Sequence, residues 1–242
     1  MKRAIIIGAT SGIGLAVSKQ LWNDGWTIGI AGRRIERLES IKQELGERVH
    51  ISQLDVTKEE ASEQMLSLIS SVGGVDLIFL CSGIGSQNRE LSAEIELNTV
   101  KTNVEGFTRM IDTAFNYFQK NGGGHIAAVS SIAGTKGLGI AAAYSATKGF
   151  QNIYIQCLAQ LSSMTKSNII FTDIRPGFVD TDLLKSGKFP MLLNVDYVAK
   201  IIVKALYRKK RVVVVDWKYK ILVFFWRMIP RFIWERLNIA NN

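Results

Sequence analysis

Short apolar runs alternate with helical patterns along almost the whole chain. The runs are four to six residues long and rich in β-branched side chains, which is typical of strands buried in a sheet. They cover residues 4–7, 27–31, 49–54, 75–80, 126–129, 169–174 and 211–215. The intervening segments place apolar residues at helical spacing over 15–22, 35–45, 59–71, 93–120, 141–164 and 195–207. This alternation predicts a doubly wound α/β fold, with one parallel sheet of about seven strands and helices on both faces.

A glycine-rich turn at residues 8–14 separates the first predicted strand from the first predicted helix. A strand, a glycine turn and a helix N-terminus together aim backbone N–H groups and the positive end of the helix at a phosphate. One alternative is an ordinary turn. A hydrolase nucleophile elbow is excluded at this position, because the segment lacks the G-x-S-x-G pattern. We therefore expect a Rossmann-type dinucleotide site that includes Gly8, Thr10, Ser11, Gly12, Ile13 and Gly14.

Two arginines, Arg33 and Arg34, stand where a fold that binds NAD(H) usually has an acidic residue. An acid there holds a ribose hydroxyl and repels a 2′-phosphate, whereas a guanidinium binds that phosphate through charge-assisted hydrogen bonds. The pair therefore favours NADP(H) as the cofactor over NAD(H). The alternative is that both arginines are solvated at the start of the next helix.

Two further turns follow predicted strands at the same edge of the sheet. Asp55 ends the third strand, where ligands gather in open α/β sheets, and it can reach an adenine amino group. Its alternative role is to begin the next helix. Ser82 and Gly83 lie in a second glycine turn, after the fourth strand. We expect all three residues to line the cofactor site.

A tyrosine and a lysine, Tyr144 and Lys148, are four residues apart in one predicted helix and therefore share a face of it. A phenol with a pKa of about 10 becomes a useful proton donor at neutral pH when an ammonium group stabilises its phenolate. Ser131 follows the fifth strand and can hydrogen-bond a substrate oxygen that Tyr144 polarises. Together these residues predict acid–base chemistry at a substrate oxygen. Singly, such residues are more often found on surfaces and in turns.

The composition indicates one globular domain in a reducing compartment. Of 242 residues, 47% are hydrophobic, 21% are charged and only three are proline, so no linker is indicated. Cys81 and Cys157 lie far apart and form neither a disulfide framework nor a zinc motif. The apolar run before Gly8 is too short for a secretory signal. We expect a cytoplasmic protein without a metal.

The net charge of +9 comes entirely from the C-terminal part of the chain. Residues 1–199 carry 19 basic and 19 acidic side chains, whereas residues 200–242 carry 11 basic and 2 acidic ones. An enzyme that acts on nucleic acid would more plausibly spread its basic residues along a groove of its body. This distribution therefore argues against a nucleic-acid partner.

With these residues in view, the chain resembles the short-chain dehydrogenase/reductase family up to about residue 215. The matching pieces are the 8–14 turn, Asp55-Val56, Asn103, Ser131, Tyr144-Ser145-Ala146-Thr147-Lys148 and Pro176-Gly177, in the family's order. The resemblance implies that Tyr144 exchanges a proton with the substrate while hydride passes to or from a nicotinamide. It implies that Lys148 lowers the pKa of Tyr144 and bonds the nicotinamide ribose. Ser131 would orient the substrate oxygen, and Asn103 would hold a water that links Lys148 to a proton relay.

The same resemblance extends the cofactor site. It implies that Arg33 replaces the acid that selects NAD, and that Asp55 and Val56 flank the adenine. It adds four residues after the sixth strand: Pro176, Gly177, Val179 and Thr181. Of these, Thr181 would lie near the nicotinamide amide. The resemblance also suggests a homo-dimer or a homo-tetramer.

Two positions depart from the family pattern. Ile7 stands before the first glycine, where the family usually has Thr, and Cys81-Ser82-Gly83 replaces the family's Asn-Ala-Gly turn. Both departures lie in the scaffold beside the cofactor rather than in the chemical groups. Cys81 is either a reactive thiol or a buried structural one.

Two C-terminal segments carry further apolar residues. Residues 178–194 match the family's substrate loop, and their Leu, Phe and Met side chains either suit a lipophilic carbonyl or pack as a lid. Residues 217–237 place Trp and Phe among Lys and Arg, and Pro230 divides them into two helices too short to span a bilayer. This tail either lies in a membrane interface beside anionic lipid, or caps the core or a subunit contact.

We therefore expect residues 1–215 to form an NADP(H)-dependent catalytic domain, with residues 216–242 as its basic aromatic tail. The predicted activity is that of a carbonyl reductase or alcohol dehydrogenase. The alternatives are an NADP-binding sensor without turnover and a membrane-surface interaction protein on the same fold. The set of Asn103, Ser131, Tyr144 and Lys148 argues against a sensor, because a sensor does not need a tuned phenol.

Overall fold

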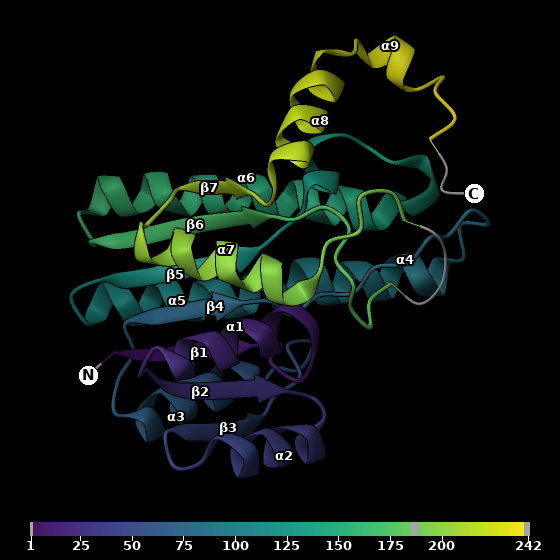
Figure 1. Cartoon of the computed structure of the whole chain (residues 1–242). Helices are drawn as coiled ribbons and strands as arrows, with labels where there is room; N and C mark the ends of the chain where they lie inside the picture. The colour runs from purple at the N-terminus through teal and green to yellow at the C-terminus, as the bar shows by residue number, and fades with distance from the viewer. Residues whose placement is uncertain (1, 185–188, 240–242) are drawn as a thin grey trace.

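The computed structural model describes residues 2–184 and 189–239 and contains a parallel sheet of seven strands (Figure 1). The strands are β1 (Arg3–Ile7), β2 (Thr27–Gly32), β3 (Val49–Gln53), β4 (Leu77–Leu80), β5 (Gly124–Val129), β6 (Ile169–Arg175) and β7 (Val212–Val214). Their order is β3-β2-β1-β4-β5-β6-β7, and every neighbouring pair is parallel. The strand order reverses between β1 and β4, and ligands bind beyond the carboxyl ends of strands at such a switch point.

Helices cover both faces of the sheet, which confirms the predicted architecture. One layer contains α1 (Gly12–Asn23), α2 (Ile35–Leu45) and α7 (Val195–Tyr207), and the other contains α3 (Ala61–Val72), α5 (Phe107–Lys120) and α6 (Ala142–Thr165). Within β1, Ala4 and Ile6 belong to the first core cluster, whereas Ile5 and Ile7 belong to the second. Because strand side chains alternate between faces, a strand covered on both sides must be apolar throughout.

The segment from residue 93 to residue 120 is helical throughout, as predicted, but it contains a π-helical turn. It consists of α4 (Ala93–Val100), the π-helical segment η1 (Lys101–Gly106) and α5. A single π-helical turn adds about one residue to the ladder, and such a small change does not disturb the apolar spacing enough to be visible in a sequence. Asn103 lies in η1, so the structure places this candidate residue on a widened helical turn.

The connection from β5 to α6 runs through two short 3₁₀ turns, η2 (Ile132–Thr135) and η3 (Gly139–Ala141). Ser131 caps the first turn by accepting a hydrogen bond from the Ala133 N–H at 3.1 Å. This connection, residues 132–141, is called the catalytic-side loop below because Ser131 precedes it and Tyr144 follows it.

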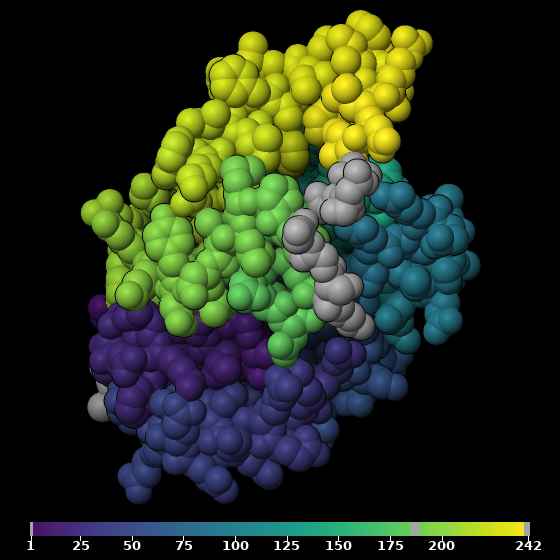
Figure 2. Space-filling view, turned by 45° about the vertical axis from the view of Figure 1, so that its right-hand side comes forward, coloured from purple at the N-terminus to yellow at the C-terminus, as the bar shows by residue number. Residues whose placement is uncertain are grey.

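The tail contains α8 (Trp217–Met228) and α9 (Arg231–Trp234), with Pro230 between them as predicted. It extends past the sheet in Figure 1 and forms the yellow lobe at the top of Figure 2. Tyr219, Val223 and Trp234 are buried, so this part of the tail caps the body of the protein. Within the described ranges, no helix combines the length and apolarity needed to cross a membrane.

Candidate active site

The 8–14 turn has a shape that only glycine fits at two of its positions. Gly8 has a φ of 92°, and a Cβ atom on it would stand 2.6 Å from the backbone nitrogen of Ser82. A Cβ atom on Gly14 would stand 2.2 Å from the carbonyl oxygen of Gly8. The backbone of the turn therefore lies directly against both α1 and the segment after β4, as a close phosphate cradle requires.

The start of α1 is arranged to accept an anion. Ser11 precedes the helix, and its side chain makes no capping hydrogen bond to the first turn. The N–H groups of the first helical residues, such as Gly12 and Ile13, lack acceptors within the helix, and the helix dipole adds positive potential there. Together with the glycine cradle, this geometry fits the pyrophosphate of a dinucleotide.

Arg34 lies directly on this turn. Its Nη2 atom donates hydrogen bonds to the Thr10 Oγ1 atom at 2.6 Å and to the Ser11 Oγ atom at 2.8 Å. The Arg33 side chain is exposed, while the Arg33 carbonyl oxygen accepts a hydrogen bond from Gln53 at 3.1 Å. The sequence places the phosphate contact mainly on Arg33, whereas in the structure Arg34 makes the contacts with the turn.

Asp55 and Val56 follow β3 and play different structural parts. The Asp55 carboxylate accepts hydrogen bonds from the backbone N–H and the hydroxyl of Thr57, at 3.0 and 2.9 Å. Burial raises the pKa of Asp55, but these hydrogen bonds and the nearby positive charges of Arg33 and Lys58 outweigh it and lower the pKa overall. The side chain of Val56 is buried in the core, so its backbone is the part that can face a cofactor.

The residues after β6 are held by a tyrosine from the tail. Tyr219 lies so close to Gly177 that a Cβ atom there would stand 2.1 Å from its ring. The Tyr219 hydroxyl accepts a hydrogen bond from the Phe178 N–H at 3.0 Å and lies 3.2 and 3.1 Å from the carbonyl oxygens of Pro190 and Met191. Tyr219 thus fixes both ends of the loop, and no signal in the sequence pointed to this role.

The other residues predicted in this region approach the glycine turn or pair within the loop. The Thr181 methyl group would stand 3.0 Å from a Cβ atom on Gly12. Val179 is buried and forms a parallel bridge with Leu193. The Pro176 carbonyl oxygen accepts a hydrogen bond from the Ile132 N–H at 3.1 Å, which joins the turn after β6 to the catalytic-side loop.

Tyr144 lies between Ser131 and Gly85. The Ser131 hydroxyl lies beside the Tyr144 phenol, and a Cβ atom on Gly85 would stand 2.5 Å from the Tyr144 ring. Burial raises the pKa of Tyr144, and the Ser131 hydroxyl offsets only part of this effect. The net direction is upward in this structure, opposite to the lowering that the sequence predicts. Sequence reasoning also missed Gly85, whose small size leaves room for the ring.

Lys148 is buried beside Tyr144, with its Nζ atom 5.8 Å from the centre of the tyrosine ring. The ammonium group donates hydrogen bonds to the Val129 carbonyl oxygen at 3.0 Å and to the Gln151 Oε1 atom at 2.9 Å. Burial lowers the pKa of Lys148 to about 8, although nearby Cys81 and Asp173 act in the opposite direction. Gly83 lies close to the ammonium group, because a Cβ atom there would be in van der Waals contact with Nζ, at 3.6 Å.

Asn103 and Gln151 form a fully buried polar link to Lys148. The Asn103 side chain exchanges two hydrogen bonds with the Ile84 backbone, at 2.9 and 2.7 Å. The main-chain carbonyl oxygen of Asn103 accepts a hydrogen bond from the Gln151 Nε2 atom at 2.8 Å. The Gln151 amide thus lies between Lys148 and Asn103. The water that the sequence predicts at Asn103 stays a prediction. Gln151 lies three residues after Lys148 on the same helix, and this spacing is the sequence signal that could have indicated the link.

The thiol of Cys81 lies at the same edge. Burial raises the pKa of Cys81 to about 12, despite the opposing charge of Lys148 and a backbone hydrogen bond from Gly14. A thiol with so high a pKa is not a nucleophile at neutral pH. The structure therefore supports the structural alternative for Cys81. Cys81 and Cys157 are both free.

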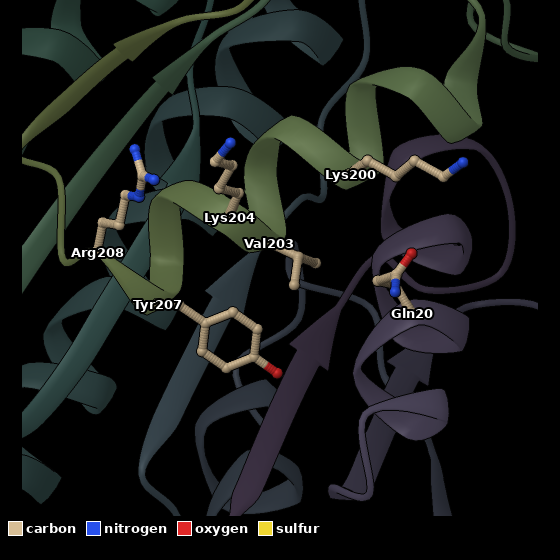
Figure 3. Close-up of a pocket in the computed structure, with 6 residues that line it drawn as sticks. All are labelled: Gln20, Lys200, Val203, Lys204, Tyr207 and Arg208. Carbon is tan, nitrogen blue, oxygen red and sulfur yellow. The ribbon is translucent and has the colours of Figure 1, made fainter.

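Two hollows among the described residues lie outside the group formed by Ser131, Tyr144 and Lys148. A shallow one of about 400 Å³ lies between α1 and α7, where the side chains of Lys200, Lys204 and Arg208 point in different directions (Figure 3). Because its cations diverge, it does not form a binding site for one anion. The other, of about 740 Å³, lies between the catalytic-side loop and the tail and includes Leu138, Ile140, Trp234 and Leu237.

The predicted substrate loop is described in part, because residues 185–188 lie outside the described ranges. Phe178 and Phe189 contact each other, with ring centres 5.0 Å apart, and Leu193 is buried. Leu183 and Leu192 are exposed. The described parts of the loop therefore pack partly on the body and partly present apolar side chains outward.

The comparisons with known proteins agree with this geometry. The family model for short chain dehydrogenases matches residues 2–188. An uncharacterized oxidoreductase from Myxococcus xanthus is 29% identical over 95% of this chain and 93% of its own length. Another from Listeria monocytogenes is 36% identical over 76% of this chain and 77% of its own length.

Solved structures extend the likeness to the fold. A 3-ketoacyl-(acyl-carrier-protein) reductase from Brucella melitensis, solved with NADH, has a TM-score of 0.80 and 27% identity, covering 89% of this chain and 96% of that one. An alcohol dehydrogenase from Thermococcus sibiricus, solved with 5-hydroxy-NADP, has a TM-score of 0.77 and 27% identity over the same shares.

The fold and the edge with its glycine turn define an oxidoreductase that binds a nicotinamide cofactor. The chain belongs to the short-chain dehydrogenase family. The solved neighbours carry NADH in one case and an NADP derivative in the other, so they leave the choice between the two cofactors open.

Proposed function

We propose that this protein interconverts a carbonyl and an alcohol with NADP(H), using Tyr144 as the acid and base. The observation that carries this proposal is the convergence of Ser131, Tyr144 and buried Lys148 beside the glycine turn. The Ser131 hydroxyl lies beside the phenol and lowers its pKa, and we infer that a substrate oxygen between the two groups receives a hydrogen bond from each.

The reduction needs one hydride and one proton at the carbonyl group. The bound nicotinamide supplies the hydride to the carbonyl carbon. Tyr144 donates its proton to the oxygen as negative charge develops there, and Ser131 stabilises that charge with a hydrogen bond. In the oxidation direction the phenolate takes the alcohol proton instead. The positive charge of Lys148 next to the ring stabilises the phenolate in both directions.

Gln151 and Val129 hold Lys148 in place for this task. An ammonium group has three N–H donors, and the two hydrogen bonds to Gln151 and Val129 use two of them. The third donor is left for the nicotinamide ribose. We assign Gln151 as a positioning residue, because it contacts Lys148 rather than the reacting atoms.

The preference for NADP(H) rests on Arg33 and Arg34. Arg34 already lies on the hydroxyls of Thr10 and Ser11, at the start of α1. Two guanidinium groups at the end of β2, where an acidic residue would select NAD(H), suit a 2′-phosphate. Asp182 is the acid that approaches Arg34, at 3.8 Å, and this contact is exposed. A bound phosphate would therefore compete with a weak surface pair.

We propose a lipophilic substrate because the substrate loop presents apolar side chains, such as Leu183 and Leu192. Two free cysteines agree with a cytoplasmic protein. The family resemblance supports a homo-dimer or homo-tetramer with small-molecule substrates as its other partners.

The decisive experiment compares Tyr144→Phe with the wild type on a panel of aliphatic, aromatic, steroidal and acyl-chain carbonyls with NADPH. Removing the phenolic proton is expected to lower kcat roughly 100- to 10,000-fold while NADPH binding is retained. Tyr154→Phe is the matched control, since Tyr154 is on the same helix and its hydroxyl bonds Asp112. Full activity of Tyr144→Phe would refute the proposed role. NADPH binding without turnover of any compound would favour the sensor.

Cofactor choice is tested separately with Arg34→Ala and Arg33→Ala. Each loss of a charge-assisted contact with the 2′-phosphate is expected to raise the KM for NADPH roughly tenfold or more, and to leave the KM for NADH nearly unchanged. An equal effect on both cofactors would contradict the assignment to the 2′-phosphate.

A further inference from the structure

Helix α8 carries apolar residues on two opposite faces. The inner face, Tyr219, Val223 and Trp226, packs against the body of the protein. The outer face is a stripe at positions i, i+4, i+7 and i+11, formed by Trp217, Ile221, Phe224 and Met228, which are 61%, 48%, 62% and 66% exposed. A surface helix normally has one apolar stripe toward the core and polar residues on the opposite face, so the second, outer stripe calls for a second apolar environment.

Further exposed aromatic residues extend this stripe. Phe225 lies beside it on α8, and Phe232 on α9 is 63% exposed. These residues and the stripe together are called the outer face of the tail. Six large apolar side chains exposed on two consecutive short helices differ from the single exposed residues that occur on any protein surface.

Positive charges border the outer face. By helical spacing, Lys220 and Arg227 lie on one side of the stripe and Lys218 lies on the other. Residues 200–242 carry 11 basic and 2 acidic side chains, whereas the rest of the chain is balanced. Of the two acids, Asp216 caps α8 and Glu235 pairs with Arg231. The border of the outer face therefore keeps its positive charge.

We propose that the outer face of the tail docks the protein on a lipid bilayer that contains anionic headgroups. Exposed Trp and Phe side chains suit the interface between headgroups and acyl chains, and the Lys and Arg residues at the border suit anionic lipid. A second copy of this chain fits less well, because a two-fold contact places the same patch on both sides and brings the two basic borders together.

The inner side of the tail connects this docking surface to the catalytic-side loop. Trp226 donates a hydrogen bond to Thr135 at 2.9 Å, and Trp234 donates one to the Gly137 carbonyl oxygen at 2.7 Å. Lys136 donates one to the Ile229 carbonyl oxygen at 2.6 Å. Docking would therefore place this loop, and the 740 Å³ cavity beside it, close to the bilayer surface.

The inference goes beyond the proposed function and does not depend on turnover. The test is co-sedimentation of the full chain with vesicles of phosphatidylcholine alone and of phosphatidylcholine with phosphatidylglycerol. We expect binding to the mixed vesicles that weakens as salt is raised, and little binding to the neutral ones. Equal binding to both, or none to either, would overturn the proposal.

Variants then locate the binding surface. Phe224→Ser with Phe232→Ser is expected to reduce binding to the mixed vesicles roughly 100-fold, and Lys220→Gln with Arg227→Gln roughly 10-fold. The matched controls are Leu66→Ser with Met164→Ser, which are exposed elsewhere, and Lys200→Gln with Lys204→Gln on α7. Both controls should bind like the wild type.

Oligomeric state and folding are measured on the same samples. Unchanged circular dichroism and melting temperature show that a variant is folded, and an unchanged mass by light scattering supports lipid as the occupant. If Phe224→Ser with Phe232→Ser instead dissolves an oligomer and leaves vesicle binding intact, a second copy covers the outer face and the proposal is wrong.

Discussion

The turn before α1 and the tail that begins with α8 both follow a strand at the carboxyl edge of the sheet, but different forces hold them in place. The turn is fixed by backbone packing so close that Gly8 and Gly14 leave no space for a side chain. The tail is fixed by side chains, through Tyr219, Trp226 and Trp234. Backbone fit therefore holds the turn, whereas side-chain contacts hold the tail.

The two regions also differ in how far their apolar side chains are buried. Around the turn, β1 is buried on both faces and the polar groups of Asn103, Lys148 and Gln151 are paired with one another. In the tail, Phe224 and Phe232 face outward. The first region is complete in one molecule, whereas the second presents a surface for something outside it.

The largest expected effect tests the backbone packing of the turn. Gly14→Ala places a Cβ atom 2.2 Å from the Gly8 carbonyl oxygen, so the turn must shift. We expect about a hundredfold loss of NADPH affinity and a loss of stability of about 1–3 kcal/mol. Titration of NADPH and thermal unfolding check this. Gly139→Ala, where a Cβ atom meets open space, should change neither quantity.

The next effect concerns the buried polar link. The charged form of Lys148 predominates below a pKa of about 8, so activity that needs this charge falls as the pH rises through that value. Gln151→Leu removes an acceptor from the ammonium and should move the fall to lower pH by about one unit, with kcat roughly tenfold lower. Gln151→Glu adds a negative charge and should move the fall to higher pH.

The pH profile of kcat, measured with each variant, separates a positioning role from a purely structural one. Loss of packing alone would lower activity at every pH without moving the profile. Opposite displacements for the leucine and glutamate variants support the role in holding Lys148, and displacement in the same direction would contradict it.

A smaller effect is expected where the tail reaches the catalytic edge. Tyr219→Phe keeps the ring on Gly177 but leaves the buried Phe178 N–H without its acceptor. We expect a loss of about 1–3 kcal/mol, or a melting temperature lower by about 3–9 °C, together with a raised KM for the carbonyl substrate. Tyr197→Phe is the control, since its hydroxyl bonds Asp216 at the surface. An unchanged KM would show that the tail does not shape the substrate loop.

The smallest effect is expected within the tail itself. Trp226→Phe keeps an aromatic ring but removes the hydrogen bond to Thr135. We expect a cost of about 1 kcal/mol, or about 2–4 °C in melting temperature, with unchanged kcat in solution. A large loss of kcat would show that the tail controls the catalytic-side loop even without a membrane.

Much of the fold followed from local patterns. The apolar runs predicted the strands because a parallel sheet covered on both faces requires continuous apolar stretches, as in β1 and β4. The family resemblance also brought Ser131, Tyr144 and Lys148 into one site, since each lies at a recognisable place beside a strand or on a helix. The π-helical turn at Asn103 was not predicted, because one extra residue in a turn leaves the apolar spacing almost unchanged.

The order of apolar and polar residues along the chain was enough to predict the sheet, its helices and which candidate residues lie at its edge. Contacts between distant segments are decided only when the chain folds, because they depend on distances that no spacing encodes. Three contacts are of this kind: the Gln151 link between Lys148 and Asn103, the hydrogen bond of Arg34 to Thr10, and the hydrogen bond of Tyr219 to the loop after β6. The same holds for α8, where packing alone decided which aromatic residues turn inward and which remain exposed.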